Sequence, residues 1–184
     1  MKQRRAGMSA EAAALYQSLR DGGLAVPDRA TLPAYRIAVR DGFEASIQAA
    51  LAAFEGDVEL IEIAGTGCRQ LTPSGWSSDS GLCMLYAYGG GYVSGSTYED
   101  LILTASLARH SGIRIVMVEY RLSPEYPYPQ PQQDMRAVYP LLLRQYGAER
   151  LLLGGESAGG NQVLGLLQHA RDNGLAQPRC AVLF

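Results

Sequence analysis

The spacing of apolar residues changes from a helical to a strand period near residue 56. Before that point, apolar positions recur as on one face of an amphipathic helix, and glycines mark the helix ends. A first helix is expected to begin at Ser9, which can cap it, and to end at Gly22-Gly23. Its apolar face consists of Leu15, Tyr16 and Leu19. A second helix is expected to end at Gly56, with a buried stripe of Ile47, Ala50, Leu51 and Phe54.

After residue 56, short apolar runs alternate with helical segments. Strands are expected at residues 58–63, 68–71, 82–86, 113–118, 151–153 and 181–184. Helices are expected at residues 98–111, from about 132 to 146, and from 162 onward. Continuous apolar runs are typical of strands buried on both faces, and strands that alternate with helices form parallel sheets. The sequence therefore predicts an α/β fold, with a mostly parallel sheet flanked by helices.

A glycine-rich segment, residues 154–160, joins the expected strand at residues 151–153 to the helix after it. Its residues Gly155-Glu156-Ser157-Ala158-Gly159 fit G-x-S-x-G, the nucleophile elbow, in which a strand turns sharply into a helix and exposes a serine hydroxyl. Glycines flank the serine because the turn is strained and its neighbours are close. Ser157 is therefore the candidate nucleophile.

Glycine-rich loops after strands also bind phosphates, so two other site types need to be considered. A phosphate-binding loop of an NTPase needs a lysine followed by serine or threonine. Those positions hold Gly160 and Asn161, and the only lysine in the chain is Lys2. The sequence thus excludes that class of site.

A dinucleotide-binding fold remains an alternative. Residues 85–119 have the pattern strand, glycine turn, helix, strand, with the acidic Glu119 at the end. The third glycine of that fingerprint is replaced by Ser94, and Gly95 comes one residue late. This displacement would misplace the pyrophosphate relative to the start of the helix.

An acyl-transfer site accounts for both glycine loops together. Such a serine needs backbone N–H groups that stabilise the oxyanion of the tetrahedral intermediate. They come from the residue after the nucleophile and from an earlier glycine loop at the same sheet edge. Ala158 supplies the first donor, and Gly90 and Gly91, in the loop after the strand at residues 82–86, supply the others.

Three motifs, in this order, resemble the hormone-sensitive-lipase-like branch of the α/β-hydrolases, also called bacterial family IV esterases. Residues 88–96, Y-G-G-G-Y-V-S-G-S, resemble the family's H-G-G-G-[FWY]-x-x-G-S. Residues 118–125, V-E-Y-R-L-S-P-E, resemble V-D-Y-R-L-A-P-E, and residues 155–161, G-E-S-A-G-G-N, resemble G-D-S-A-G-G-N. The similarity covers roughly residues 58 to 184.

The resemblance implies an α/β-hydrolase fold and a role for each matching residue. Ser157 is the expected nucleophile, and the oxyanion hole is expected to consist of Gly90, Gly91 and Ala158. Tyr88, which stands where the family has histidine, and Gly89 are expected to support the oxyanion loop. Structural links between strand and loop are expected from Arg121, Glu125 and Asp134. Residues 1–55 are expected to form a helical cap segment and residues 56–184 a partial α/β-hydrolase core.

The general base is not evident in the chain. In α/β-hydrolases the carboxylate and the histidine of the triad follow the serine. His169 lies twelve residues after Ser157 on the same expected helix, about 18 Å away at 1.5 Å per residue. His110 is expected at the opposite edge of the sheet from the site. The triad Asp and His are therefore expected beyond residue 184, in a longer hydrolase truncated here after the start of the strand that follows the nucleophile helix.

Composition and charge narrow the class of partner. A formal net charge of −2 and a pI near 5.7 argue against binding to nucleic acid or to an anionic membrane surface. The apolar runs are too short for a transmembrane helix. Three cysteines, Cys68, Cys83 and Cys180, lack metal-ligand spacing and are expected to be buried thiols in a reducing compartment. A cytoplasmic location is therefore expected.

Together these features predict a serine carboxylesterase that hydrolyses small apolar esters through an acyl-enzyme. No cofactor or metal is expected, the expected partner is a small-molecule ester, and a homo-oligomer is compatible with the sequence. The 184 residues alone are expected to be inactive. The alternative is a non-catalytic ligand-binding receptor, as in the plant gibberellin receptors, which resemble this family but lack a working histidine base.

Overall fold

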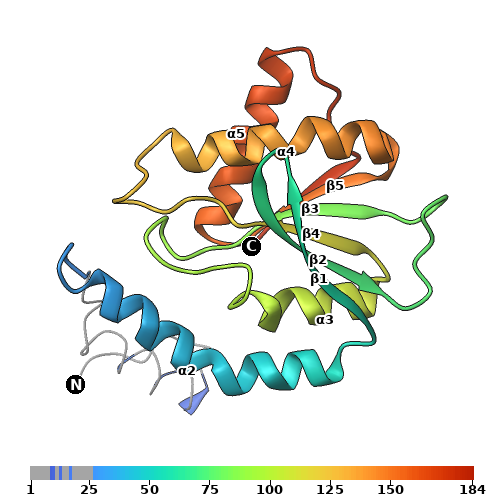
Figure 1. Cartoon of the computed structure of the whole chain (residues 1–184). Coiled ribbons are helices and arrows are strands. Elements are labelled where there is room, and N and C mark those ends of the chain that lie inside the picture. Colours follow the sequence, from blue (N-terminus) through green and yellow to red (C-terminus); the bar gives the residue numbers. More distant parts are fainter. Residues whose placement is uncertain (1–8, 11–12, 14–16, 18–26) are drawn as a thin grey trace. The chain divides into compact units, whose positions relative to one another are not determined.

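A computed structural model describes residues 9–10, 13, 17 and 27–184 of the chain (Figure 1). The apolar face of the first expected helix (Leu15, Tyr16 and Leu19) and its end at Gly22-Gly23 lie outside the described residues. The chain falls into two compact units, residues 1–33 and 34–184. In the first unit, Asp28 Oδ1 accepts hydrogen bonds from the backbone N–H groups of Ala30 and Thr31, at 3.0 and 2.8 Å.

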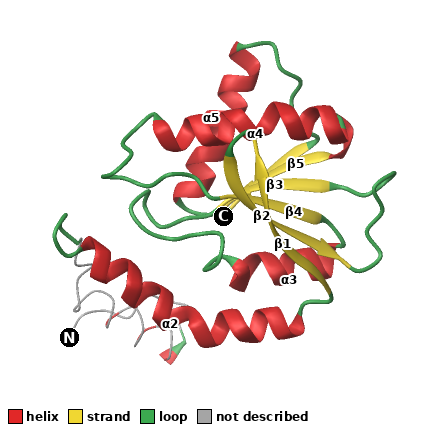
Figure 2. Ribbon diagram, viewed as in Figure 1, coloured by secondary structure: helices red, strands yellow, loops and turns green. Residues whose placement is uncertain are grey.

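The strands of the described part of the chain form one mixed sheet, in the order β1-β2-β4-β3-β5-β6 (Figure 2). They are β1 (Gly56–Ile63), β2 (Thr66–Pro73), β3 (Cys83–Ala87), β4 (Arg114–Val118), β5 (Leu151–Gly155) and β6 (Cys180–Leu183). The hairpin β1-β2 is antiparallel, and β2 also runs antiparallel to β4. The remaining pairs are parallel. Each expected strand is confirmed to within two residues at its ends, and so is the mostly parallel sheet.

Helices cover both faces of this sheet. They are α2 (Leu32–Ala53), α3 (Leu101–Ser111), α4 (Gln130–Tyr146) and α5 (Ala158–Asp172). In the views of Figures 1 and 2, α4 and α5 lie on one side of the sheet and α3 lies on the other. This arrangement confirms the expected α/β class.

Three helices begin at different residues from those expected. The helix expected from residue 162 begins at Ala158, directly after the elbow, and the other two differ for local reasons. The helix expected from residue 98 begins at Leu101, because the Ser96 hydroxyl accepts hydrogen bonds from the N–H groups of Tyr98 and Glu99, both at 3.3 Å. That turn replaces the first helical turn. The helix expected from about residue 132 begins at Gln130, since Pro131 is well suited to a first helical turn.

The central strands β3, β4 and β5 are almost entirely buried and form the core with the inner faces of the helices. The stripe expected on α2 packs against this core, and its Ile47 is 0% exposed. In the described part of the chain, no helix is long and apolar enough to cross a membrane.

The expectation of three buried thiols is correct for two cysteines and wrong for the third. Cys68 and Cys83 are buried, and burial raises the pKa of each thiol to about 12. Cys180 is exposed, because it begins β6, which lies at the edge of the sheet. Such an edge position could not be read from the spacing of the cysteines.

Candidate active site

The expected nucleophile lies in a sharp turn between β5 and α5. Ser157 has φ 50° and ψ −116°, a conformation that residues with a side chain rarely adopt, and its side chain is exposed. Its N–H donates to the Phe184 carbonyl at 3.0 Å, and the Phe184 N–H donates to Gly155 at 3.0 Å. The end of β6 therefore fixes the turn that presents the Ser157 hydroxyl.

Close backbone packing holds the start of α5 against the end of β3. A Cβ atom on Gly159 would lie 2.0 Å from the Ala87 carbonyl oxygen and 2.6 Å from that of Tyr88. No side chain fits in this space. The third fixed position of the G-x-S-x-G pattern is thus a glycine because the helix starts in direct contact with the neighbouring strand.

The glycine loop after β3 and the elbow after β5 converge at the same edge of the sheet. The Glu156 N–H donates to the Ala87 carbonyl at 3.4 Å, and the Tyr92 hydroxyl donates to Asn161 Oδ1 at 2.6 Å. The two loops come together because β3 and β5 are adjacent parallel strands, whose carboxyl ends share one edge.

Three backbone N–H groups at this edge are available to a ligand. In the described residues, the N–H groups of Gly90, Gly91 and Ala158 donate to no acceptor. Gly90 adopts φ 102°, and a Cβ atom there would lie 2.1 Å from the Ser94 carbonyl oxygen. The Ser94 N–H in turn donates to the Gly90 carbonyl at 3.0 Å, which closes the turn. The loop therefore directs its carbonyl inward and leaves its donors free.

Tyr88 is joined to Tyr120 by two crossed hydrogen bonds. The Tyr88 hydroxyl donates to the Tyr120 carbonyl at 2.9 Å, and the Tyr120 hydroxyl donates to the Tyr88 carbonyl at 2.7 Å. The two rings stack with their centres 4.1 Å apart. Burial raises the pKa of both hydroxyls. Tyr88 thus links the base of the glycine loop to the end of β4 and does not point toward Ser157.

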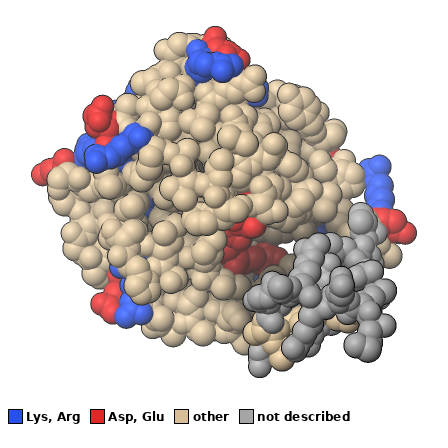
Figure 3. All heavy atoms as spheres, turned by 180° about the vertical axis from the view of Figure 1, so that it is seen from behind, with Lys and Arg blue, Asp and Glu red and all other residues tan. Residues whose placement is uncertain are grey.

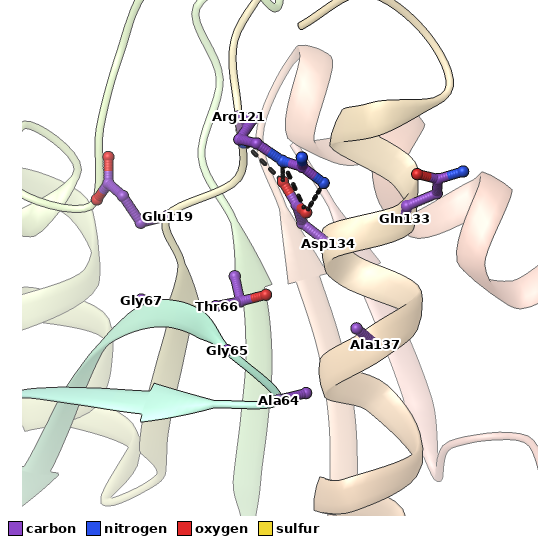
Figure 4. A pocket seen from close by; sticks show the side chains of 9 residues that line it. All are labelled: Ala64, Gly65, Thr66, Gly67, Glu119, Arg121, Gln133, Asp134 and Ala137. Atoms are coloured by element: carbon purple, nitrogen blue, oxygen red, sulfur yellow. Dashed lines mark hydrogen bonds and ion pairs between the residues drawn. The ribbon is translucent and has the colours of Figure 1, made fainter.

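The motif after β4 holds its loop to α4 through an ion pair. Arg121 and Asp134 point toward one another, while Glu119 points away (Figure 4). Both oxygens of the Asp134 carboxylate accept hydrogen bonds from Arg121, from the backbone N–H at 2.9 Å and from the guanidinium at 2.7 to 3.1 Å. This geometry is consistent with the structural link expected of these two residues.

Arg36 joins α2 to the glycine loop and to the loop after β4. This residue was not identified from the sequence. Its guanidinium donates to the carbonyls of Val93 and Ser123, at 2.7 and 2.9 Å, and to both carboxylate oxygens of Glu125, at 3.0 and 2.9 Å. Glu125, expected to link strand and loop, therefore pairs with a helix. No sequence signal marks Arg36, because its partners lie 57 to 89 positions away in the chain.

A hollow of about 450 Å³ beside the glycine loop combines carboxylates with apolar side chains. Its lining includes Glu99, Asp100 and Glu156 together with Phe43 and Leu103. The main cause that raises the pKa of Asp100 to about 6 is burial; the Tyr86 hydroxyl opposes the shift, and Glu156 and Glu99 add to it. In Figure 3, acidic atoms are visible near the middle of the face shown. This carboxylate group was not predicted from the sequence.

The structure does not bring either histidine to Ser157. His169 lies in the last turn of α5, at the opposite end of that helix from Ser157, and contacts Asn173 at 3.1 Å. His110 lies in the last turn of α3, which leads into the first residue of β4 and hence to the other edge of the sheet. Its Nδ1 is 2.8 Å from the Ser106 carbonyl. Across the described residues, no group of three or more His, Cys, Asp or Glu side chains could hold a metal ion.

Comparisons with known proteins agree with this arrangement. Residues 84–184 match a protein family whose description is alpha/beta hydrolase fold. The acetyl-hydrolase of Streptomyces hygroscopicus is 36% identical over 103 residues, which are 55% of this chain and 34% of that protein. The ethyl acetate hydrolase of Pseudomonas putida is 34% identical over 111 residues, 57% of this chain and 35% of that protein.

A solved esterase from the bacterial hormone-sensitive lipase family superposes with a TM-score of 0.71 at 28% identity, over 96% of this chain and 57% of that one. In contrast to this structure, the two curated relatives named above are matched over only about a third of their length. The family match covers more than half of the chain and selects the hydrolase fold over the dinucleotide-binding alternative. The chain belongs to the α/β-hydrolase family, in the branch that resembles hormone-sensitive lipase.

Proposed function

We propose that the protein to which these residues belong is a serine carboxylesterase with Ser157 as its nucleophile. One observation carries this proposal: an exposed serine in a strained turn lies at the sheet edge where the N–H groups of Gly90, Gly91 and Ala158 have no acceptor among the described residues. Unused donors at such a position are suited to stabilising negative charge that develops during acyl transfer.

The proposed reaction follows from these groups. The Ser157 hydroxyl oxygen attacks the acyl carbon of the ester while a base removes its proton. The carbonyl oxygen becomes an oxyanion and accepts hydrogen bonds from Gly90, Gly91 and Ala158. The intermediate then collapses, the alcohol leaves with a proton from the base, and water hydrolyses the acyl-enzyme. Ser157 is regenerated, and no cofactor takes part.

The base and the carboxylate that orients it belong to sequence beyond residue 184 in this proposal. His110 and His169 lie at the far ends of their helices, away from Ser157. An unassisted serine hydroxyl is a poor nucleophile. We therefore expect residues 1–184 alone to show no Ser157-dependent turnover.

The substrate is proposed to carry a small, apolar acyl group. The hollow beside the glycine loop has apolar walls that include Val39, Phe43 and Leu103. The relatives named acetyl-hydrolase and ethyl acetate hydrolase support a short acyl chain. Residues 1–55 are proposed to form a helical cap segment and residues 56–184 a partial α/β-hydrolase core.

The test compares hydrolysis of p-nitrophenyl acetate by two polypeptides: residues 1–184, and a longer product of the same gene that continues past Phe184. The longer polypeptide is expected to hydrolyse the ester, and Ser157→Ala to abolish turnover. Ser106→Ala, at an exposed serine on α3, is the matched control and should leave the rate unchanged.

Two results would contradict the proposal. Hydrolysis that persists in Ser157→Ala would show that another group is the nucleophile. A longer polypeptide that binds esters without hydrolysing them would favour the receptor alternative.

A further inference from the structure

A polar groove runs along α4 and α5, beginning next to the elbow. A small hollow of about 190 Å³ and a larger one of about 430 Å³ share Tyr128, Gln132 and Asn161 in their linings, so they form one groove. The two helices pack against one another on the same face of the sheet (Figure 1). The groove lies on the other side of the sheet from α3 and is separate from the carboxylate-lined hollow.

Two residues that line the groove each carry a buried polar atom, one an acceptor and one a donor, that has no hydrogen-bond partner in the described structure. Gln132 is 7% exposed, and in the described structure its Oε1 has no hydrogen-bond partner. The buried Nε of Arg136 has none either. These residues lie four positions apart on α4 and so share one face of the helix. Leaving buried polar groups of this kind unpaired is energetically unfavourable, so a partner is expected.

The shape of the groove depends on Gly165 of α5. A Cβ atom at this position would lie 2.7 to 2.9 Å from the Gln132 side-chain amide. The amide therefore packs directly against the helix backbone, and space remains above it. Gln168 and Asp172 continue the same face of α5 and line the groove farther from the elbow.

The near end of the groove lies about one helical turn along α5 from Ser157, which itself lines neither hollow. Asn161 lies one helical turn after Ser157, about 6 Å along the helix axis at 1.5 Å per residue. Its Oδ1 accepts the hydrogen bond from Tyr92, the residue that follows the glycine donors. A group attached to an ester bound at Ser157 would therefore enter the groove beside Tyr92 and Asn161.

The chemistry of the groove matches hydroxyl groups. Hydroxyl groups both donate and accept, so they suit both the Gln132 oxygen and the Arg136 N–H. An anion only accepts and would leave the Gln132 oxygen unpaired, whereas an ammonium only donates and would face Arg136. Both signs of charge, Arg136 and Asp172, line the groove. Tyr128, 78% exposed at the rim, offers an aromatic face for the C–H groups of a ring.

We propose that this groove binds the polyhydroxylated alcohol part of the ester, such as a sugar, while the acyl group lies at Ser157. The position of the ester bond in this inference rests on the proposed esterase function. Binding of the sugar itself depends only on the groove. The two can therefore be tested separately.

The first experiment measures binding of methyl β-D-glucopyranoside to the longer polypeptide by saturation-transfer NMR. The signal is expected for the wild type and expected to be lost in Gln132→Leu, which removes the buried acceptor, and in Tyr128→Ala. Tyr128 is exposed, so this second variant tests the groove without disturbing the core. Gln133→Leu is the matched control, since Gln133 is exposed and lines a different hollow, and it should bind as the wild type does.

The second experiment compares kcat/KM for a methyl 6-O-acetyl glucoside and for p-nitrophenyl acetate, in the longer polypeptide. Gln132→Leu is expected to lower the ratio of the two about tenfold, and Gln133→Leu to leave it unchanged. Absence of glucoside binding, or equal binding by all variants, overturns the inference and would indicate that only water pairs these groups. Absence of Ser157-dependent hydrolysis of p-nitrophenyl acetate would instead overturn the proposed function and leave the binding result intact.

Discussion

At the scale of single residues, burial makes the Asp100 carboxyl an unusually weak acid. Its pKa is raised from 3.8 to about 6, so the folded protein keeps the proton to higher pH than the unfolded chain does. The stability that this group contributes is therefore fully present below about pH 4 and is lost as pH rises through about 6. Near pH 7 the ionised carboxylate destabilises the fold, by an amount on the order of 2–3 kcal/mol.

Asp100→Asn is expected to raise the free energy of unfolding at pH 7 by this amount, with little change at pH 4. Urea unfolding at the two pH values measures it. Asp79→Asn, at an exposed carboxylate, is the control and should change stability by less than about 0.5 kcal/mol. An equal effect of Asp100→Asn at both pH values would contradict this explanation.

The crossed pair of tyrosines leads to a second expectation for single residues. Tyr88→Phe removes the hydrogen bond to the Tyr120 carbonyl and leaves a buried oxygen without its donor. The expected loss of stability is about 1 kcal/mol, measured by urea unfolding. Tyr126→Phe, at an exposed side chain, should have almost no effect. If both variants lose the same stability, the crossed pair does not hold the loop.

The roles of single residues were predictable from the sequence only where the backbone geometry requires a particular residue type, such as glycine. The elbow could be identified because glycine is needed where α5 starts against β3, and this leaves a pattern in consecutive residues. Arg36 and Asp100 could not be identified. Their partners are distant in the chain, and the burial that changes Asp100 arises only when α3 packs beside the glycine loop.

At the scale of elements, the start of α5 lies against the end of β3 with no room for a side chain between them. Gly159→Ala would place a Cβ atom 2.0 Å from the Ala87 carbonyl oxygen, so backbone must move. We expect the free energy of unfolding to fall by about 1–3 kcal/mol. Because the movement would displace the Ser157 turn, any esterase activity of the longer polypeptide should fall as well.

Gly160→Ala is the matched control, one residue along the same helix. The nearest atom to a Cβ there is the Gly155 carbonyl oxygen at 3.5 Å, which is ordinary contact. Since alanine favours helices over glycine by about 1 kcal/mol, this variant should be as stable as the wild type or more so. Equal destabilisation by the two variants would show that the contact with β3 is not the cause.

The positions of helices and strands were predictable because the spacing of apolar residues reflects which side chains are buried. The residues at which these elements begin and end were harder to predict. The strand expected at residues 82–86 is found at Cys83–Ala87, since its apolar run is buried on both faces. The start of α3 was misplaced because Ser96 forms a local turn that competes with the helix. The antiparallel pairing of β2 with β4 was not predicted, because the sequence does not specify which strands become neighbours.

At the scale of the whole molecule, the described sheet ends in an apolar strand. β6 pairs with β5 alone in the described structure, and Val182, Leu183 and Phe184 are 37%, 45% and 58% exposed. Exposed edges of this kind pair with other chains. We expect residues 1–184 to associate with one another at micromolar concentration, and light scattering measures this.

Val182→Lys should reduce the association, because charged residues protect strand edges. Ile37→Lys, which places the same charge on an exposed position of α2, is the control and should have a smaller effect. A monodisperse wild-type chain, or equal effects of the two lysines, would contradict the role of the edge.

Through Arg36, the position of α2 depends on the order of the two loops that this residue contacts. Its guanidinium connects α2 to the backbone of two loops, so docking of the helix and ordering of the loops are energetically coupled. Such linkage is reciprocal: a ligand that immobilises the glycine loop must favour the docked helix by the same factor. Hydrogen exchange of the α2 amides should therefore slow when an ester analogue occupies the site, and Arg36→Gln should uncouple the two events.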